Sequence, residues 1–151
     1  MTVRGPTLFS GYWNAEETNR RDFRGGRFHM GDVFVRHADG TLDFVDRLKY
    51  MIKSGGENIY PAEIERVLLA HAAISDAAVV RKPDPRWGEV PVAFVSLEPG
   101  QVVDAAMLAD WCRERLSRYK QPREFRFIDV SQFPRSSTGK IQRHEVERTL
   151  L

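Results

Sequence analysis

The sequence predicts an α+β fold, in which a central sheet is flanked by helices and a smaller β-rich segment comes first. Hydrophobic residues make up 42% of the 151 residues and charged residues 29%, a balance that favours a buried core over disorder. From residue 49 onward, apolar strands and amphipathic helices alternate with short links. Residues 1–48 carry strand and hairpin signals with one short polar helix. We therefore predict two parts, 1–48 and 49–151.

The first part is rich in turns. Residues 14–23 predict a polar helix headed by Asn14, with acidic residues in its first turn. Residues 33–45 alternate between apolar and polar positions around Asp39-Gly40, which predicts a β-hairpin. No predicted element covers the apolar residues of this hairpin. Because exposed strand edges recruit neighbours, we expect residues 1–45 to pack against another domain or against a second copy in a homodimer.

The second part begins with a strand at residues 50–53 and a loop at 54–58, whose adjacent glycines permit positive φ. Pro61 suits the first turn of the helix that follows. The apolar stripe of this helix consists of Ile64, Val67 and Leu68.

Two strands, residues 76–80 and 90–97, enclose a proline-rich loop. Pro91 has no N–H for a strand ladder, so we expect the second strand to begin at an edge or entry position. Asp104 predicts the N-cap of a further helix, residues 124–130 alternate as a strand, and a final helix follows.

Composition narrows the possible sites and locations. The single cysteine, Cys112, excludes an internal disulfide and a zinc site built on paired cysteines, and we expect no metal site. No apolar run approaches the ~20 residues of a membrane-spanning helix, and no signal-peptide pattern is visible. We therefore expect a cytoplasmic protein with no membrane partner.

Positive charge gathers at the C-terminal end. Residues 113–151 contain ten lysines or arginines against five acidic residues, although the whole chain has a net charge of +2. This asymmetry indicates a polyanionic partner, either nucleic acid or a phosphorylated small molecule. A solvated basic surface is the alternative.

One lysine within this basic region stands in a loop of small residues, "PRSSTGKIQR" (134–143). The P-loop pattern requires glycine where Pro134 stands and serine or threonine where Ile141 stands, so this is not a P-loop. Lys140 could instead approach a phosphate from outside. The alternative is a solvated lysine at the start of a helix.

Several separated motifs occur in one order along nearly the whole chain. They are "GYWN", "GGRFHMGD", "DRLKYMIKSGGENIYPAEIE", "PDPRWGEVPVAFV", "LSRYKQPREFRFID" and "PRSSTGKIQR". Together they resemble the C-terminal portion of the adenylate-forming acid–CoA ligases, and more closely the branch that activates aryl and fatty acids. The resemblance implies a small, mobile C-terminal lid domain at residues 49–151. Residues 1–48 would then be the β-rich end of a large N-terminal domain.

The resemblance also implies an enzymatic activity. Members of this family join a carboxylic acid to ATP as an acyl-adenylate and then transfer the acyl group to coenzyme A. The ATP phosphate loop, the acid pocket and the ligands of the Mg²⁺ that accompanies ATP lie upstream in the family. We therefore expect a fragment that is inactive alone, with the missing N-terminal domain as its partner and small molecules as substrates.

Four residues are assigned roles by the resemblance. Lys140 would be the catalytic lysine of adenylation, since a compact charge on a flexible stem can enter and leave a cleft. Asp32 would accept hydrogen bonds from both ribose hydroxyls of the nucleotide, and Arg47 would reach the ribose or a phosphate. Lys49 would be the hinge. Met30 departs from the family's usual threonine.

A second set is assigned to coenzyme A. These residues are Gly55, Gly56, Glu57, Trp87, Tyr119, Lys120 and Arg123. The glycine loop would line the pantetheine channel, the two rings would pack on the adenine, and the two basic side chains would meet phosphates. Gln121 replaces a basic residue common in relatives, which removes one phosphate contact.

Two other functions remain open. The chain could be a stand-alone binding module for nucleic acid or a nucleotide, with the basic C-terminal third as its surface and Trp87 and Tyr119 as stacking platforms. Salt-dependent binding to random single strands would favour this reading. It could also be a structural, oligomerising piece. The motif order favours small-molecule substrates over nucleic acid.

Overall fold

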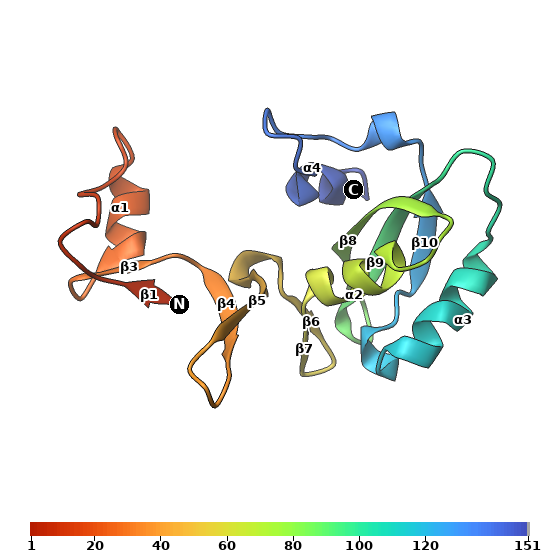
Figure 1. Cartoon of the computed structure of the whole chain (residues 1–151), viewed down its shortest axis with the longest axis horizontal. Helices are drawn as coiled ribbons and strands as arrows, with labels where there is room; N and C mark the ends of the chain where they lie inside the picture. Colours follow the sequence, from red (N-terminus) through yellow and green to blue (C-terminus); the bar gives the residue numbers. More distant parts are fainter. Residues whose placement is uncertain (151) are drawn as a thin grey trace. The chain divides into compact units, whose positions relative to one another are not determined.

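The structure is a computed structural model that describes residues 1–150, and it confirms the predicted α+β class. The chain folds as two compact units (Figure 1). The first spans Met1–Lys49, and the second begins at Tyr50.

The first unit consists of short strands and one helix. These are β1 (Thr2–Val3), α1 (Glu16–Asp22), β2 (Phe23–Arg24), β3 (Arg27–His29), β4 (Asp32–Arg36) and β5 (Leu42–Arg47). Strands β1, β3 and β2 form one antiparallel sheet, and β4 pairs with β5. The helix that was predicted to start at Asn14 begins at Glu16. Ala15 occupies the cap position, and Asn14 adopts a left-handed backbone with φ of 49°.

The predicted hairpin forms between β4 and β5. At its turn, Asp39 Oδ1 accepts hydrogen bonds from the Thr41 hydroxyl at 2.7 Å and the Thr41 N–H at 2.9 Å, which lower the pKa of Asp39. Val35, Leu42 and Phe44 are about half exposed in the described chain. A partner surface that covers them remains a prediction.

The second unit contains a five-stranded sheet and three helices. Its strands are β6 (Ile52–Ser54), β7 (Glu57–Ile59), β8 (Ile74–Asp84), β9 (Gly88–Leu97) and β10 (Glu124–Phe127). Its helices are α2 (Pro61–Leu69), α3 (Ala105–Arg115) and α4 (Arg143–Arg148), with 3₁₀ turns at Arg118–Lys120 and Val130–Gln132. Strand β9 pairs antiparallel with β8 and parallel with β10, and Ser54 of β6 pairs with Gly88.

Pro91 is the fourth residue of β9 and pairs with β8 alone, so it occupies an edge position on its other side. It pairs with Arg81 of β8, and its carbonyl accepts a hydrogen bond from Arg123 N–H at 2.9 Å. The N–H and C=O of one strand residue point to the same side. The missing N–H of Pro91 therefore faces the interval between its neighbours on that side, because β6 pairs at Gly88 and β10 begins at Val92.

Both faces of the sheet are buried, which explains the continuous apolar runs in β8 and β9. One face carries Val79, Ala93 and Val95, and α2 and α3 cover it through residues such as Ile64 and Leu108. The other face carries Val80, Val92 and Phe94, and α4 covers it through Val146 (Figure 1). The two sets alternate along each strand, as the pleat requires.

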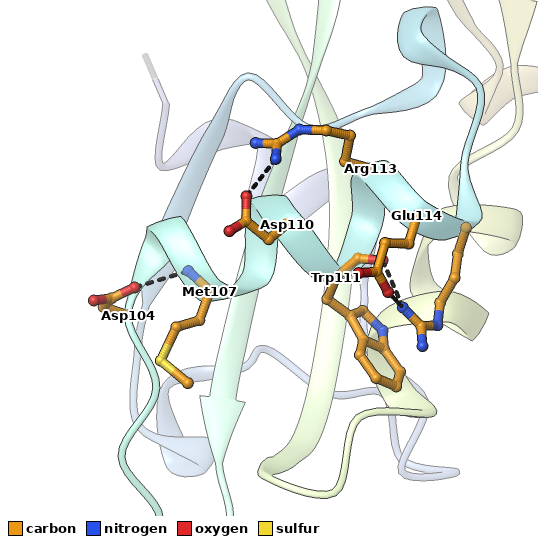
Figure 2. A network of polar contacts seen from close by, with 7 residues as sticks. Asp104, Met107, Asp110, Trp111, Arg113 and Glu114 are labelled. Atoms are coloured by element: carbon orange, nitrogen blue, oxygen red, sulfur yellow. Dashed lines mark hydrogen bonds and ion pairs between the residues drawn. The ribbon is translucent and has the colours of Figure 1, made fainter.

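Side chains of helix α3 cap its first turn and fix its packing against α2 (Figure 2). Asp104 is the predicted N-cap, and its Oδ1 accepts a hydrogen bond from Met107 N–H at 2.8 Å. Asp110 and Arg113 form an ion pair at 2.6 Å one turn later. The Arg115 guanidinium covers the Trp111 ring at 3.4 Å, and the indole donates to the Val67 carbonyl at 2.8 Å, which fixes α3 against α2.

The buried thiol of Cys112 on α3 is expected to be unreactive in the folded chain. Burial raises the pKa of Cys112 to about 11. At pH 8 such a thiol is ionised in about one molecule in a thousand, whereas an ordinary thiol in the unfolded chain is substantially ionised. A disulfide reagent should therefore label the folded chain at least a hundredfold more slowly than the urea-unfolded chain, by roughly the ratio of the thiolate fractions. Equal labelling rates would contradict the burial of this side chain.

Candidate functional site

The loop of residues 134–142, the lysine loop, is a tight hairpin in the second unit. Arg135 and Ile141 form an antiparallel bridge across it. Ser136 N–H donates to the Lys140 carbonyl and Gly139 N–H to the Ser136 carbonyl, both at 2.9 Å. Gly139 has φ of 80°, a conformation that favours glycine. The small residues therefore form a narrow tip that ends at Lys140.

Lys140 is exposed at this tip. Within residues 1–150 its ammonium group has no hydrogen-bond or ion-pair partner. The hairpin itself is held, because Arg135 forms an ion pair with Asp76 at 2.8 Å and donates to the Gly139 carbonyl at 3.0 Å. An exposed ammonium group thus stands on an anchored loop.

A pocket of about 520 Å³ lies where three loops of the second unit meet. We call it the arginine pocket, and its lining residues are Ser54, Gly55, Glu57, Arg86, Trp87, Arg118, Tyr119 and Arg123. The lining includes three guanidinium groups, one carboxylate and two aromatic rings, so the pocket suits an anion with an aromatic portion. Five of the seven residues assigned to coenzyme A line it; Gly56 and Lys120 do not.

Trp87 is held in the turn between β8 and β9. Asp84 Oδ1 accepts hydrogen bonds from the N–H groups of Arg86 and Trp87 at 2.9 and 2.8 Å. Gly55 N–H donates to the Trp87 carbonyl at 2.9 Å. The Arg86 guanidinium covers the indole at 4.8 Å. Arg86 and Arg118 were not predicted as site residues, although Arg86 adjoins Trp87 and Arg118 adjoins Tyr119 in the sequence.

Lys120 turns to a carboxylate of its own chain. Its ammonium contacts both oxygens of Glu63 on α2, at 2.7 and 2.8 Å. The Glu63 carboxylate raises the pKa of Lys120. An incoming phosphate would have to compete with Glu63 for this ammonium group.

Asp32 and Arg47 face each other in the first unit. They are register partners on β4 and β5, and Arg47 Nε lies 3.2 Å from Asp32 Oδ1. The two side chains form an ion pair, but its geometry is not that of a hydrogen bond. In the described part of the chain, the buried Oδ1 atom of Asp32 therefore accepts no hydrogen bond. A pocket of about 420 Å³ includes Asp32 and Gly31. The unsatisfied oxygen can accept a hydrogen bond from a ligand hydroxyl.

Lys49 lies in a 3₁₀ turn, Leu48–Tyr50, at the boundary between the two compact units. The structure therefore places Asp32 and Arg47 in one unit, and Lys140 and the arginine pocket in the other. Lys140 does not line that pocket, and the lysine loop and the β6–β7 turn lie at different sides of the second unit (Figure 1).

Residues 1–150 contain neither a metal-binding cluster nor a membrane-spanning helix. No group of three or more His, Cys, Asp or Glu side chains is placed to hold a metal ion. None of the described helices is both long and apolar enough to cross a membrane.

Comparison with known proteins gives a consistent family match. The model of the AMP-binding enzyme C-terminal domain matches residues 63–140. The chain is 42% identical over 150 residues to the 2-succinylbenzoate–CoA ligase of Geobacillus kaustophilus and 45% identical over 148 residues to a feruloyl-CoA synthase of Amycolatopsis. These alignments cover 99% and 98% of this chain and 30% of each relative. The chain thus spans about 30% of the length of the curated relatives it matches.

A solved structure is similar over the same region. The o-succinylbenzoate CoA synthetase of Bacillus subtilis, in complex with its acyl-adenylate intermediate, superposes with a TM-score of 0.89 and 40% identity. The match covers 97% of this chain and 29% of that enzyme. The same enzyme in complex with ATP and magnesium superposes with a TM-score of 0.86 and 40% identity, over 95% of this chain and 29% of that one.

A substitution at Gly55 should displace the Trp87 ring. A Cβ atom at Gly55 would lie 2.7 Å from Trp87 Cε3, closer than real contacts allow. In Gly55→Ala, the indole N–H resonance of Trp87 should shift, while that of Trp111, bonded to Val67, should stay in place. NMR spectra assigned with Trp87→Phe and Trp111→Phe variants measure both, since the chain contains a third tryptophan, Trp13.

Gly56→Ala is the matched control for this change. A Cβ at Gly56 meets nothing within 4 Å, although its φ of +89° makes the substitution strained. It should lower stability by about 1–2 kcal/mol without moving the Trp87 resonance. Equal shifts in both variants would mean that backbone strain, rather than contact with the ring, governs the pocket.

Proposed function

The chain belongs to the family of AMP-binding enzyme C-terminal domains, and we propose that it serves as the mobile lid of an ATP-dependent acid–CoA ligase. In the proposed reaction, a carboxylate attacks the α-phosphate of ATP, pyrophosphate leaves, and an acyl-adenylate forms. The thiol of coenzyme A then attacks the acyl carbon, and AMP leaves. Negative charge develops on oxygen in both steps, so positive groups aimed at those oxygens are the main catalytic device.

The observation that carries this proposal is the free ammonium group of Lys140 at the tip of an anchored hairpin. Lys140 would enter the cleft between the acid's carboxylate and the α-phosphate, and donate hydrogen bonds to the oxygens on which charge develops. An ammonium already paired within the domain would have to break that pair first. Lys140 has no such partner in the described chain, whereas Lys120 has one in Glu63.

We assign Asp32 and Arg47 to the nucleotide. Asp32 would accept hydrogen bonds from the ribose hydroxyls, which its unsatisfied buried oxygen supports. Arg47, half exposed beside it, would reach the ribose or a phosphate. Mg²⁺ would enter with ATP, and we propose no residue of this chain as its ligand.

We assign coenzyme A to the arginine pocket. Trp87 and Tyr119, each about two-fifths exposed, offer faces for the adenine ring. Arg123, with Arg86 and Arg118, would bind the phosphates, and Gly55, Gly56 and Glu57 would border the pantetheine arm. Lys120 would add a phosphate contact only by leaving Glu63.

We further propose that the lid rotates at Lys49 between the two half-reactions. Lys140 and the thiol of coenzyme A would have to approach the same reacting centre, and the second unit carries Lys140 and the arginine pocket on different sides. The position of Lys49 at the boundary of the compact units supports this assignment. Rotation would withdraw Lys140 after adenylation and bring the arginine pocket toward the acyl-adenylate.

Two substitutions should separate the half-reactions. The assay enzyme is a fusion in which this chain replaces the matching 29% of the Bacillus subtilis o-succinylbenzoate CoA synthetase. Lys140→Ala should slow adenylation, measured as pyrophosphate release, by about 10²–10³-fold, because it removes a charge aimed at the transition state. Thioester formation from supplied acyl-adenylate should stay nearly unchanged. Lys49→Pro should do the reverse, since proline fixes φ at the hinge.

Lys82→Ala is the control for lost lysine charge. Lys82 pairs with Glu124 at 2.7 Å and has no role in the proposed site, so both half-reactions should persist. If Lys140→Ala and Lys49→Pro slow the same half-reaction to a similar degree, the two-sided lid is wrong for this chain.

The 151-residue chain alone should form no adenylate. Lys140 acts on a triphosphate that, in the proposed division of labour, another part of the ligase holds. Isotope exchange between pyrophosphate and ATP, with a panel of carboxylic acids, measures this directly. Clear exchange with any acid would show that the chain holds ATP by itself and would overturn this division.

A further inference from the structure

Arg143 is the first residue of α4 and follows Lys140 by three positions in the sequence. Its side chain is mostly buried. Its Nε donates to Glu65 Oε1 at 2.8 Å, and a second guanidinium nitrogen donates to Oε2 of the same carboxylate. The two side chains are only 17% and 14% exposed. The geometry is the two-point fork that gives an arginine–carboxylate pair a fixed orientation.

Glu65 connects this arginine to the core. Its Oε1 also accepts a hydrogen bond from Val79 N–H at 2.9 Å. Glu65 lies on α2 and Val79 on β8, and both elements belong to the apolar core beneath α2. One carboxylate therefore fixes the end of the lysine loop to a helix and to a core strand.

Arg143 also contacts the first residue of the second unit. Its guanidinium carbon lies 5.1 Å from the centre of the Tyr50 ring, within cation–π distance. Tyr50 directly follows Lys49 in the chain. The same side chain thus touches the residue after the proposed hinge and holds the segment that carries Lys140.

We propose that Tyr50, Glu65 and Arg143 form a latch that positions Lys140. The latch keeps the lysine loop rigidly attached to the residue after the hinge, so that the loop moves together with the second unit when it rotates at Lys49. The proposal rests on the proposed function, because it deepens the role of Lys140. Arg135, paired with Asp76, holds the near end of the loop, and the latch holds the far end. All three latch members are positioning residues that act through Lys140.

A positioning role accounts for a buried charge pair better than a stability role does. Desolvation offsets much of the attraction within such a pair, so its net contribution to stability is small. Its fork geometry instead selects one orientation for α4 and the loop before it. Removing either Arg143 or Glu65 takes the fork contact from a mostly buried charge, so each single variant below tests both the positioning of Lys140 and the local order of the loop.

Hydrogen exchange on the chain itself is the first test. In Arg143→Ala and Glu65→Gln, the N–H groups of Ser136, Gly139 and Gln142, each hydrogen-bonded across the loop, should exchange about tenfold faster or more. The amides of β9 should keep their protection. Arg148→Ala is the matched control, since Arg148 is on the same helix and pairs with Glu145 while 68% exposed. Unchanged exchange in the loop, or equal loosening of β9, would overturn the latch.

Kinetics of the fusion enzyme are the second test. Arg143→Ala should slow adenylation by about 10²-fold, the scale of a small misplacement of a catalytic group, and leave thioester formation within about twofold. Arg143→Lys, which keeps the charge but loses the fork, should fall between. Tyr50→Phe, which keeps the ring, should disturb adenylation less than Tyr50→Ala. Equal slowing of both half-reactions would indicate general destabilisation and would contradict positioning.

The outcomes separate failure of the latch from failure of the proposed function. If Lys140→Ala slows adenylation and Arg143→Ala does not, the latch is wrong and the function stands. If Lys140→Ala has no effect, or the unchanged fusion makes no adenylate, the proposed function is wrong. The exchange experiment then decides whether Arg143 and Glu65 hold the loop at all.

Discussion

Strand β9 is covered on both faces and paired on both edges, and the arrangement of the second unit depends on this constraint. The β8–β9 hairpin projects Trp87 at its turn. The Ser54–Gly88 pair brings the glycine turn of β6 and β7 against that tryptophan, and Arg123 N–H reaches the Pro91 carbonyl where β10 begins. The arginine pocket is therefore built from the ends of elements whose middles are fixed by apolar packing.

Ion pairs help to hold the lysine loop, whose tip has no side chains that could pack in the apolar core. The lysine loop has few side chains large enough to anchor it, because the residues at its tip are serine, threonine and glycine. Ion pairs to Asp76 and Glu65 add to the apolar contacts that Phe133 and Ile141 make at its two ends. Small residues keep the tip narrow, and arginines outside the tip keep it in place. A loop built this way can enter a cleft without losing its shape.

Lys140 and Lys120, which the resemblance assigned to different half-reactions, differ in their ion pairing. Lys140 is free within the described residues, and Lys120 is held by Glu63. In the proposed function, Lys140 approaches a centre whose charge changes during reaction, where a flexible, unpaired ammonium is useful. In the same proposal, the arginine pocket would bind coenzyme A, whose phosphates stay charged throughout, a task for which rigid guanidinium groups are suited.

The sequence alone determined the α+β class, the helix cap at Asp104 and the membership of the chain in its family, because these depend on local patterns and on motif order. It predicted an unpaired side at Pro91, because proline has no N–H for a strand ladder, but only the tertiary structure decided which strands flank that position. It also missed Arg86 and Arg118 in the pocket and assigned Lys120 to a phosphate without its Glu63 partner. The latch of Tyr50, Glu65 and Arg143 could not be read from the sequence at all. Its most distant members, Tyr50 and Arg143, are 93 residues apart, and only the packing of α2, β8 and α4 brings the side chains together.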